Sequence, residues 1–134
     1  MTYTIAQAAA KANLTTHTLR YYDKEGLLPF IERSNSGNRI FKDGDFESLA
    51  LINCLKNTGM SIKDIKTYMD WCKEGDASLN KRLDVFIKQK EAISAKMKEL
   101  ENHMNTINYK IQYYETAIEA GTEAIHKGAC PCHK

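Results

Sequence analysis

Five side chains between residues 16 and 24 have the chemistry to bind a polyanion. His17, Arg20, Tyr21 and Lys24 follow one another at i, i+3, i+4 and i+7, so they share one face of a helix, with Thr16 beside them. Such side chains donate hydrogen bonds to phosphate oxygens and base edges when a helix lies in the major groove of double-stranded DNA. A charged helix face is often only hydrated, so this interpretation depends on the neighbouring elements.

The cysteines offer a second kind of chemistry. Cys54 stands between apolar Leu51 and Leu55, and its residue chemistry favours a small, half-buried hydrophobic side chain. The alternative is a reactive thiol, which needs a nearby cation such as Lys56 to stabilise its thiolate. Cys72 falls on the apolar stripe of a later helix, and we expect it in the core.

The end of the chain, GACPCHK, could hold a metal ion. Cys130, Cys132 and His133, with His126 as a further donor, are soft ligands suited to zinc or copper(I). A Cys-Pro-Cys sequence at a terminus is also often frayed and without a ligand. No other cofactor is expected.

Short helices must position the basic face. Residues 5–12 carry a one-sided apolar stripe, and Asn13 tolerates the left-handed conformation of a tight corner. Thr15 can cap a second helix, which Gly26 ends and which turns Leu19 and Tyr22 toward the core. Two helices joined by so short a corner form a helix-turn-helix layout.

A small hairpin follows these two helices. Residues 30–33 and 39–41 read as short strands joined by a turn at 34–38, and this wing adds Arg33, Asn38 and Arg39 to the basic surface. Asp43 is expected to cap a third helix that closes at Gly59. Ser61, with an acidic residue three positions later, predicts a fourth helix, which residues 74–76 break.

A seven-residue repeat runs through residues 79–118. Its positions alternate in steps of four and three and are apolar except for Lys90: Leu79, Leu83, Phe86, Lys90, Ile93, Met97, Leu100, Met104, Ile107, Ile111, Tyr114 and Ile118. This pattern specifies a coiled coil about 60 Å long. Such a rod cannot bury its seam on its own head, so we expect a homodimer. Heptads alone leave parallel and antiparallel pairing open.

The composition restricts the class of protein. The chain has 134 residues, is 43% hydrophobic and 27% charged, and its 7 glycines and 2 prolines favour long helices over a β-sandwich. Its net charge is +2, but residues 1–42 carry six cations and three anions. No apolar run approaches the roughly 20 residues that span a membrane. There is also no secretory signal, so we expect a cytoplasmic protein with reduced cysteines.

These observations predict a mainly α fold with three regions. Residues 1–75 form a winged helix-turn-helix head of four short helices and a β-hairpin wing, residues 76–120 a coiled-coil dimerisation helix, and residues 121–134 a flexible tail containing cysteine and histidine. The head, the wing and the basic face together favour DNA binding. An enzyme is not expected, because there is no paired nucleophile and base and no glycine-rich phosphate loop. A coiled-coil adaptor would leave the basic face unexplained.

The head also closely resembles the MerR family of bacterial transcription regulators. The resemblance covers roughly Tyr3 to Trp71 and rests on YTIAQAAAKANLTTHTLRYYDKEGLLPF, RSNSGNRIF, DFESL and LKNTGMSIKDI, of which TLRYYDKEGLL is a highly specific signature. It implies an antiparallel coiled coil that holds two heads over a pseudo-palindromic operator. It also implies that the dimer bends and untwists a promoter with an overlong spacer, so that RNA polymerase can use it.

The resemblance assigns roles to individual residues. Arg20 and Tyr21 match the family's phosphate and groove contacts, Arg39 matches the arginine of the wing, and Lys56 stands where a lysine contacts the DNA backbone. Asn38 replaces the tyrosine that many members carry after the wing glycine, which puts the second wing contact in doubt.

The resemblance leaves two alternatives for the signal to which the protein responds. The chain resembles the branch that responds to aldehydes, electrophiles and nitrosative or oxidative stress through one cysteine, here Cys54. The alternative is a metal-responsive regulator that uses Cys130, Cys132 and His133. Metal-sensing relatives space their loop cysteines more widely and often take a ligand from the start of the long helix, where residues 76–78 contain neither cysteine nor histidine. A drug sensor would need an effector domain after the helix.

Overall fold

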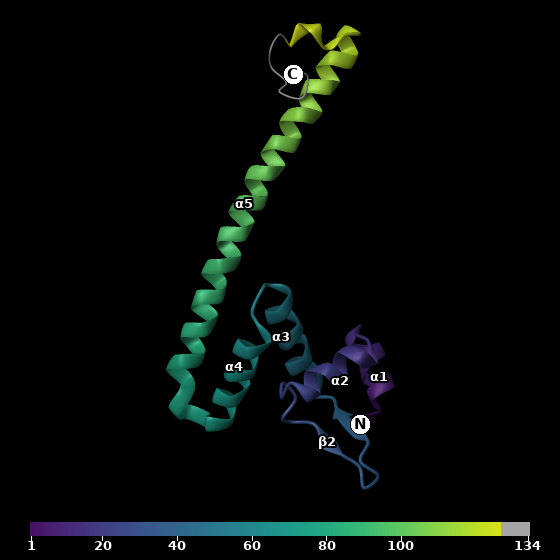
Figure 1. Ribbon diagram of the computed structural model, residues 1–134, viewed down its shortest axis with the longest axis vertical. Helices are drawn as coiled ribbons and strands as arrows, with labels where there is room; N and C mark the ends of the chain where they lie inside the picture. Colours follow the sequence, from purple (N-terminus) through teal and green to yellow (C-terminus); the bar gives the residue numbers. More distant parts are fainter. Residues whose placement is uncertain (127–134) are drawn as a thin grey trace. The chain divides into compact units, whose positions relative to one another are not determined.

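The computed structural model describes residues 1–126 and divides the chain into two compact units, Met1–Lys90 and a second that begins at Glu91. The first unit is built from short elements in the order expected for the head (Figure 1). Their bounds are β1 Thr2–Tyr3, α1 Ile5–Ala12, α2 Thr16–Lys24, β2 Glu32–Arg33, β3 Arg39–Lys42, α3 Asp45–Asn57, α4 Ile62–Glu74, the 3-10 turn Gly75–Ser78 and the start of α5, Leu79–Ala120. A second 3-10 turn, Glu123–Ile125, follows α5.

The corner between α1 and α2 forms as the sequence predicts. Asn13 adopts φ 57° and ψ 42°, the left-handed conformation, and ends α1. Thr15 then caps α2, because its side-chain oxygen accepts a hydrogen bond from the Thr18 amide at 3.0 Å. At the other end of α1, Thr4 and Gln7 cap each other's backbone amides in a capping box. Local hydrogen bonds therefore define the orientation in which the chain enters α2.

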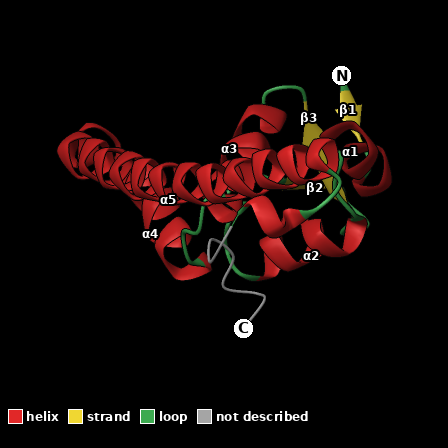
Figure 2. Cartoon of the chain, turned by 90° about the horizontal axis from the view of Figure 1, so that it is seen from above, coloured by secondary structure: helices red, strands yellow, loops and turns green. Residues whose placement is uncertain are grey.

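The sheet has one strand more than the predicted hairpin. The three strands lie in the order β1-β3-β2, all antiparallel, with Thr2 opposite Lys42 on one side and Glu32 opposite Ile40 on the other. They lie together beside α1 (Figure 2). A strand of two residues carries too little alternation to be read from the sequence. The additional strand β1 covers one edge of the wing strand β3.

The start of α3 corrects one expectation. Asp43 does not cap this helix, because the capping residue is Gly44, which has no side chain to do so. The Asp43 carboxylate instead accepts a hydrogen bond from the Tyr3 hydroxyl at 2.6 Å and so ties β1 to the head. This bond lowers the pKa of Asp43 below its ordinary value. Ser61 does cap α4, accepting from the Asp64 amide at 3.1 Å.

The core of the first unit lies between the four short helices and the sheet. Its buried side chains come from α1, α2, the following loop, β3, α3 and α4: Ala8, Ala9, Leu19, Tyr22, Leu27, Leu28, Phe41, Leu49, Ile52, Leu55, Ile65 and Met69. Leu19 and Tyr22 are fully buried, as the sequence predicts. At about 25 cal/mol per Å² of apolar area, such burial is the main force that fixes the backbone of α2.

The helix α5 is continuous over 42 residues, which confirms the predicted long helix. Most apolar positions of its seven-residue repeat are exposed in the single chain: Leu79, Leu83, Met97, Leu100, Met104, Ile107, Ile111, Tyr114 and Ile118. Within the first unit, the Phe86 ring packs edge-on against Tyr68 of α4, with centroids 5.1 Å apart. Among residues 1–126, no helix is both long and apolar enough to span a membrane.

Candidate nucleic-acid interface

The helix α2 presents one buried face and one exposed, basic face. His17, Arg20, Tyr21 and Lys24 are all exposed, and Thr16 beside them is half-buried. Because Leu19 and Tyr22 hold the opposite face in the core, the exposed side chains can contact a ligand without any change in packing. The structure thus brings together all five residues of the predicted face.

Both ends of α2 are joined to the head by residues in the left-handed conformation. Asn13 precedes the helix, and Gly26 follows it with φ +80°. This positive φ is the reason that glycine fits the position, because a Cβ atom there would meet only the flexible end of the Lys66 side chain. The ends of α2 are therefore set by these backbone conformations and by the Thr15 cap, and not by the side chains of the basic face.

One carboxylate attaches the wing to α2. The Oδ2 atom of Asp23, near the end of α2, accepts hydrogen bonds from Arg39 Nε at 2.7 Å and from Arg33 at 2.8 Å. Arg33 also donates to the carbonyl oxygen of Gly37 at 3.1 Å, which bridges the turn of the wing. Sequence reasoning missed Asp23 as a site residue, although it is an acidic side chain in a basic region that contains two wing arginines.

The two wing arginines differ in exposure. The Arg33 side chain is 51% exposed, whereas that of Arg39 is 22% exposed and lies closer to the head. Asn38 is exposed at the turn, where its backbone amide donates to Ser34 Oγ at 3.1 Å. Arg33 and Asn38 are thus the more accessible donors of the wing, and both arginines attach it to Asp23.

Lys56, near the end of α3, lies against the recognition helix α2. Its ammonium group is 5.5 Å from the centre of the Tyr22 ring, a cation–π contact. Burial raises the pKa of Tyr22, and its hydroxyl has no hydrogen-bond partner among the described residues. The exposed Lys56 of α3 therefore contacts α2 through the buried ring of Tyr22.

Cys54 is exposed, so the expectation of a half-buried side chain is wrong. The buried apolar residues of the same helix are Leu49, Ile52 and Leu55, and Cys54 lies on the side that they leave exposed. Its own carbonyl oxygen accepts hydrogen bonds from the Thr58 hydroxyl at 2.8 Å and the Thr58 amide at 3.0 Å. The thiol is thus accessible, and its backbone belongs to the last turn of α3.

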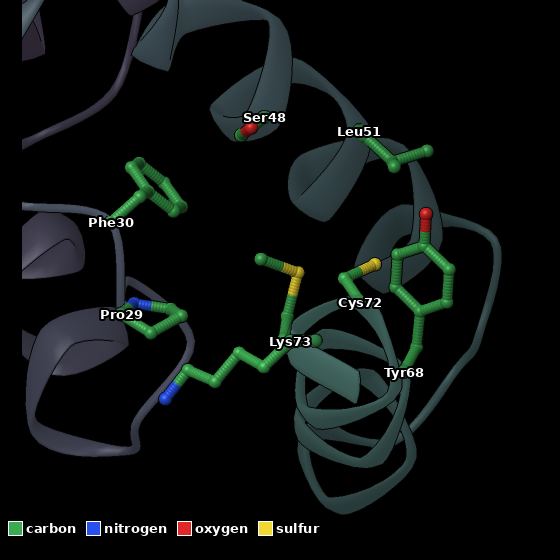
Figure 3. A pocket seen from close by; sticks show the side chains of 8 residues that line it. Pro29, Phe30, Ser48, Leu51, Tyr68, Cys72 and Lys73 are labelled. Carbon is green, nitrogen blue, oxygen red and sulfur yellow. The ribbon is translucent and has the colours of Figure 1, made fainter. Parts of the chain in front are cut away.

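Cys72 is not in the core either. It is partly buried and lines a pocket of about 330 Å³, drawn in Figure 3, where side chains of the loop after α2 face those of α3 and α4. Burial, together with a hydrogen bond to Cys72, raises the pKa of the adjacent Tyr68 to about 12. Helical periodicity correctly placed Cys72 on the inward face of α4, but at Cys72 this face borders the pocket and not the core.

The predicted metal ligands Cys130, Cys132 and His133 lie outside the described residues. His126 is described: its ring stacks on Tyr113 with centroids 4.1 Å apart, and its Nε2 atom lies 2.8 Å from Thr116 Oγ1. Within residues 1–126, no group of three or more histidine, cysteine or acidic side chains could hold a metal ion.

A helix with a free basic face, a tight corner before it and a wing attached beside it define a winged helix-turn-helix DNA-binding protein. Comparison with known proteins gives the family. Residues 3–71 match the model of the MerR HTH family regulatory proteins, and the chain belongs to this family. It is a DNA-binding transcriptional regulator and not an enzyme.

Several relatives are similar over nearly the whole chain. An uncharacterised HTH-type transcriptional regulator of Haemophilus influenzae is 43% identical, over 91% of this chain and 90% of that protein. The regulator YyaN of Bacillus subtilis is 34% identical, over 90% and 96%. Among solved structures, HiNmlR, described as a MerR family regulator lacking the sensor domain and bound to promoter DNA, is 42% identical with a TM-score of 0.83, over 93% and 99%.

Proposed function

We propose that this MerR-family regulator binds double-stranded promoter DNA as a homodimer, distorts it so that RNA polymerase can use it, and responds to electrophiles, aldehydes or oxidants through Cys54. The observation that carries the sensor assignment is the exposure of Cys54 on a helix that also contacts α2. The DNA contacts are made by Thr16, His17, Arg20, Tyr21, Lys24, Arg33, Asn38, Arg39 and Lys56.

The apolar seam of α5 supports the homodimer. Large side chains such as Met97, Leu100 and Ile118 are 64%, 66% and 79% exposed in one chain. A seven-residue apolar repeat is buried by a second helix of the same kind, because each side chain then fits between four residues of the partner. A second copy of this chain supplies that helix and places a second head on the DNA.

The relative HiNmlR is similar to this chain over both the head and the long helix. That protein is described as lacking the sensor domain, and this chain covers 99% of its length. Cys54 lies in the head, three residues before the end of α3, and Lys56 on the same turn contacts the Tyr22 ring beneath α2.

The test is transcription from the bound promoter with purified polymerase, with and without an electrophile. We expect wild type to respond to N-ethylmaleimide and to an aldehyde, and Cys54→Ser to bind the operator as wild type does but not respond. Cys72→Ser is the matched control, because it removes a thiol from a partly buried site. A Cys54→Ser protein that responds like wild type would overturn the sensor assignment.

A panel of metal ions in the same assay distinguishes the alternative, a metal-responsive regulator, from a regulator that responds to electrophiles. If Cys130, Cys132 and His133 form a zinc or copper sensor, truncation after Gly128 abolishes the response and Cys54→Ser does not. If Cys54 is the sensor, the truncated protein responds to electrophiles as the full chain does.

A further inference from the structure

A hydrogen-bonded contact joins the end of α3 to α5. The Gln89 side chain, on α5, donates from Nε2 to the Thr58 hydroxyl at 2.7 Å and to the Thr58 carbonyl oxygen at 3.1 Å. These residues lie 31 positions apart in the chain, and both belong to the first unit. We call this pair the Thr58–Gln89 contact.

The contact caps the C-terminal end of α3. Thr58 is the C-cap residue, and the last carbonyl groups of a helix have no partner within it. Gln89 supplies that partner to the Thr58 carbonyl oxygen from a different helix. The geometry of the last turn of α3 is thereby coupled to the position of one side chain on α5.

The same contact continues to Cys54. The Thr58 hydroxyl accepts from Gln89 and donates to the Cys54 carbonyl oxygen at 2.8 Å, so two hydrogen bonds separate Gln89 from the backbone of Cys54. Cys54 and Thr58 belong to the same last turn of α3, so a change in the backbone at Cys54 is transmitted to the Thr58 hydroxyl. A rotation of this turn moves the Thr58 hydroxyl relative to Gln89.

Gln89 also has room to move. Its side chain lines a surface hollow of about 360 Å³ between the α3–α4 loop, α4 and α5, which is also lined by Ser61, Asp64 and Lys88. When Thr58 moves, the Gln89 amide can turn into this hollow and find polar partners there or in water. The contact therefore has a second possible arrangement, which a coupling element requires.

We propose that the Thr58–Gln89 contact couples modification of Cys54 to the dimerisation helix α5, with Gln89 as the positioning residue. The inference rests on the proposed function, in which Cys54 is the sensor. When Cys54 adds to the double bond of a maleimide, a C–S bond forms, the π bond breaks and the thiol proton ends on the neighbouring carbon. The last turn of α3 then shifts, the contact opens, and α5 is released from the end of α3.

The experiment uses the full chain and N-ethylmaleimide. Gln89→Met removes both hydrogen bonds, and Thr58→Val removes the one to the hydroxyl, each with little change in side-chain size. Thr58→Ser keeps the hydroxyl, and Asn102→Ala on the exposed part of α5 is the control. We expect the first two variants to lose about fivefold or more of the induced change in transcription, as for residues that carry coupling. Their operator affinity and their Cys54 labelling, followed by peptide mass spectrometry, should match wild type. Thr58→Ser and Asn102→Ala should respond normally.

Hydrogen exchange gives a second readout that a merely structural role would not change. In wild type, labelling of Cys54 should speed amide exchange in residues 79–90, and in Gln89→Met the fast exchange should be present before labelling. Normal induction in both Gln89→Met and Thr58→Val, or unchanged exchange in labelled wild type, overturns the inference. If Gln89→Met and Thr58→Val are induced normally but Cys54→Ser is not induced, the inference fails and Cys54 remains the proposed sensor. Induction in Cys54→Ser overturns the proposed sensor and the inference with it.

Discussion

The Nε atom of Arg39, on the wing strand β3, lies 2.7 Å from a carboxylate oxygen of Asp23 on the recognition helix α2. This ion pair joins the two elements that carry the basic surface, and Arg33 shares the same oxygen. With 17% of its side chain exposed, Asp23 is the most buried member of the three. The position of the wing relative to α2 thus depends on one acidic side chain in a basic region.

Replacing Asp23 by asparagine should loosen the wing. Two charge-assisted hydrogen bonds are weakened, so we expect a loss of about 1–2 kcal/mol in the free energy of unfolding and about tenfold weaker operator binding. Urea unfolding and fluorescence anisotropy measure the two effects. The matched control is Glu25→Gln, which removes the same charge nearby and should bind DNA as well as wild type or slightly better. Equal affinities for the two variants would contradict the role of Asp23.

Removing the Arg20 side chain should strongly weaken specific binding without affecting the fold. Arg20 is exposed on α2, and none of its atoms is needed by the core. Loss of such a contact costs about 1–3 kcal/mol in binding free energy. Mobility shift with the operator tests this, and sedimentation should show an unchanged oligomer. Lys98→Ala on α5 removes a cation elsewhere as control, and wild-type affinity in Arg20→Ala would exclude this face as the DNA contact.

A charge on the α5 seam should separate the homodimer. Leu100 occupies a position of the seven-residue repeat, and Leu100→Glu places a carboxylate where a partner helix should pack. Burial of an unpaired charge costs several kcal/mol, so at micromolar concentration the variant should sediment as a monomer. Lys98→Glu, off the seam, should remain associated. A dimeric Leu100→Glu protein would place the interface elsewhere.

The Tyr3–Asp43 hydrogen bond should make the stability of the head depend on pH. The pKa of Asp43 is lowered in the folded state, so its contribution is present above the ordinary carboxyl pKa of about 4 and is lost as the pH falls through the lowered value. We expect Tyr3→Phe to lower the melting temperature at neutral pH, and the difference from wild type to shrink in acid. A difference independent of pH would assign the effect to the other hydrogen bond of the Tyr3 hydroxyl, which it accepts from Lys11 at 3.3 Å.

Local signals were sufficient to predict most elements of the head. The Asn13 corner and the caps at Thr15 and Ser61 depend on hydrogen bonds within a few residues, so residue type and spacing reveal them. The long helix α5 followed from a repeat sustained over many turns. The strand β1 did not, because its two residues pair with residues 41 and 42, about forty positions later in the chain.

The part of the site that lies on one face of a single helix could be predicted from the sequence. The exposed face of α2 follows from a period of 3.6 residues together with the buried Leu19 and Tyr22. Exposure of Cys54 and the pocket at Cys72 depend instead on which neighbouring elements cover those positions, and periodicity along one helix does not contain that information. Asp23 was missed for the same reason, because its partners come from another element.

The left-handed joints at Asn13 and Gly26 have a practical consequence. These two residues and the buried side chains fix the backbone of α2. The exposed side chains of α2 can therefore be replaced without a change in the backbone. Grafting the side chains of another regulator onto positions 16, 17, 20, 21 and 24 should redirect the chain to a new operator while leaving its assembly and its induction intact. Asp23 must be kept in any such variant, because its carboxylate attaches the wing to α2.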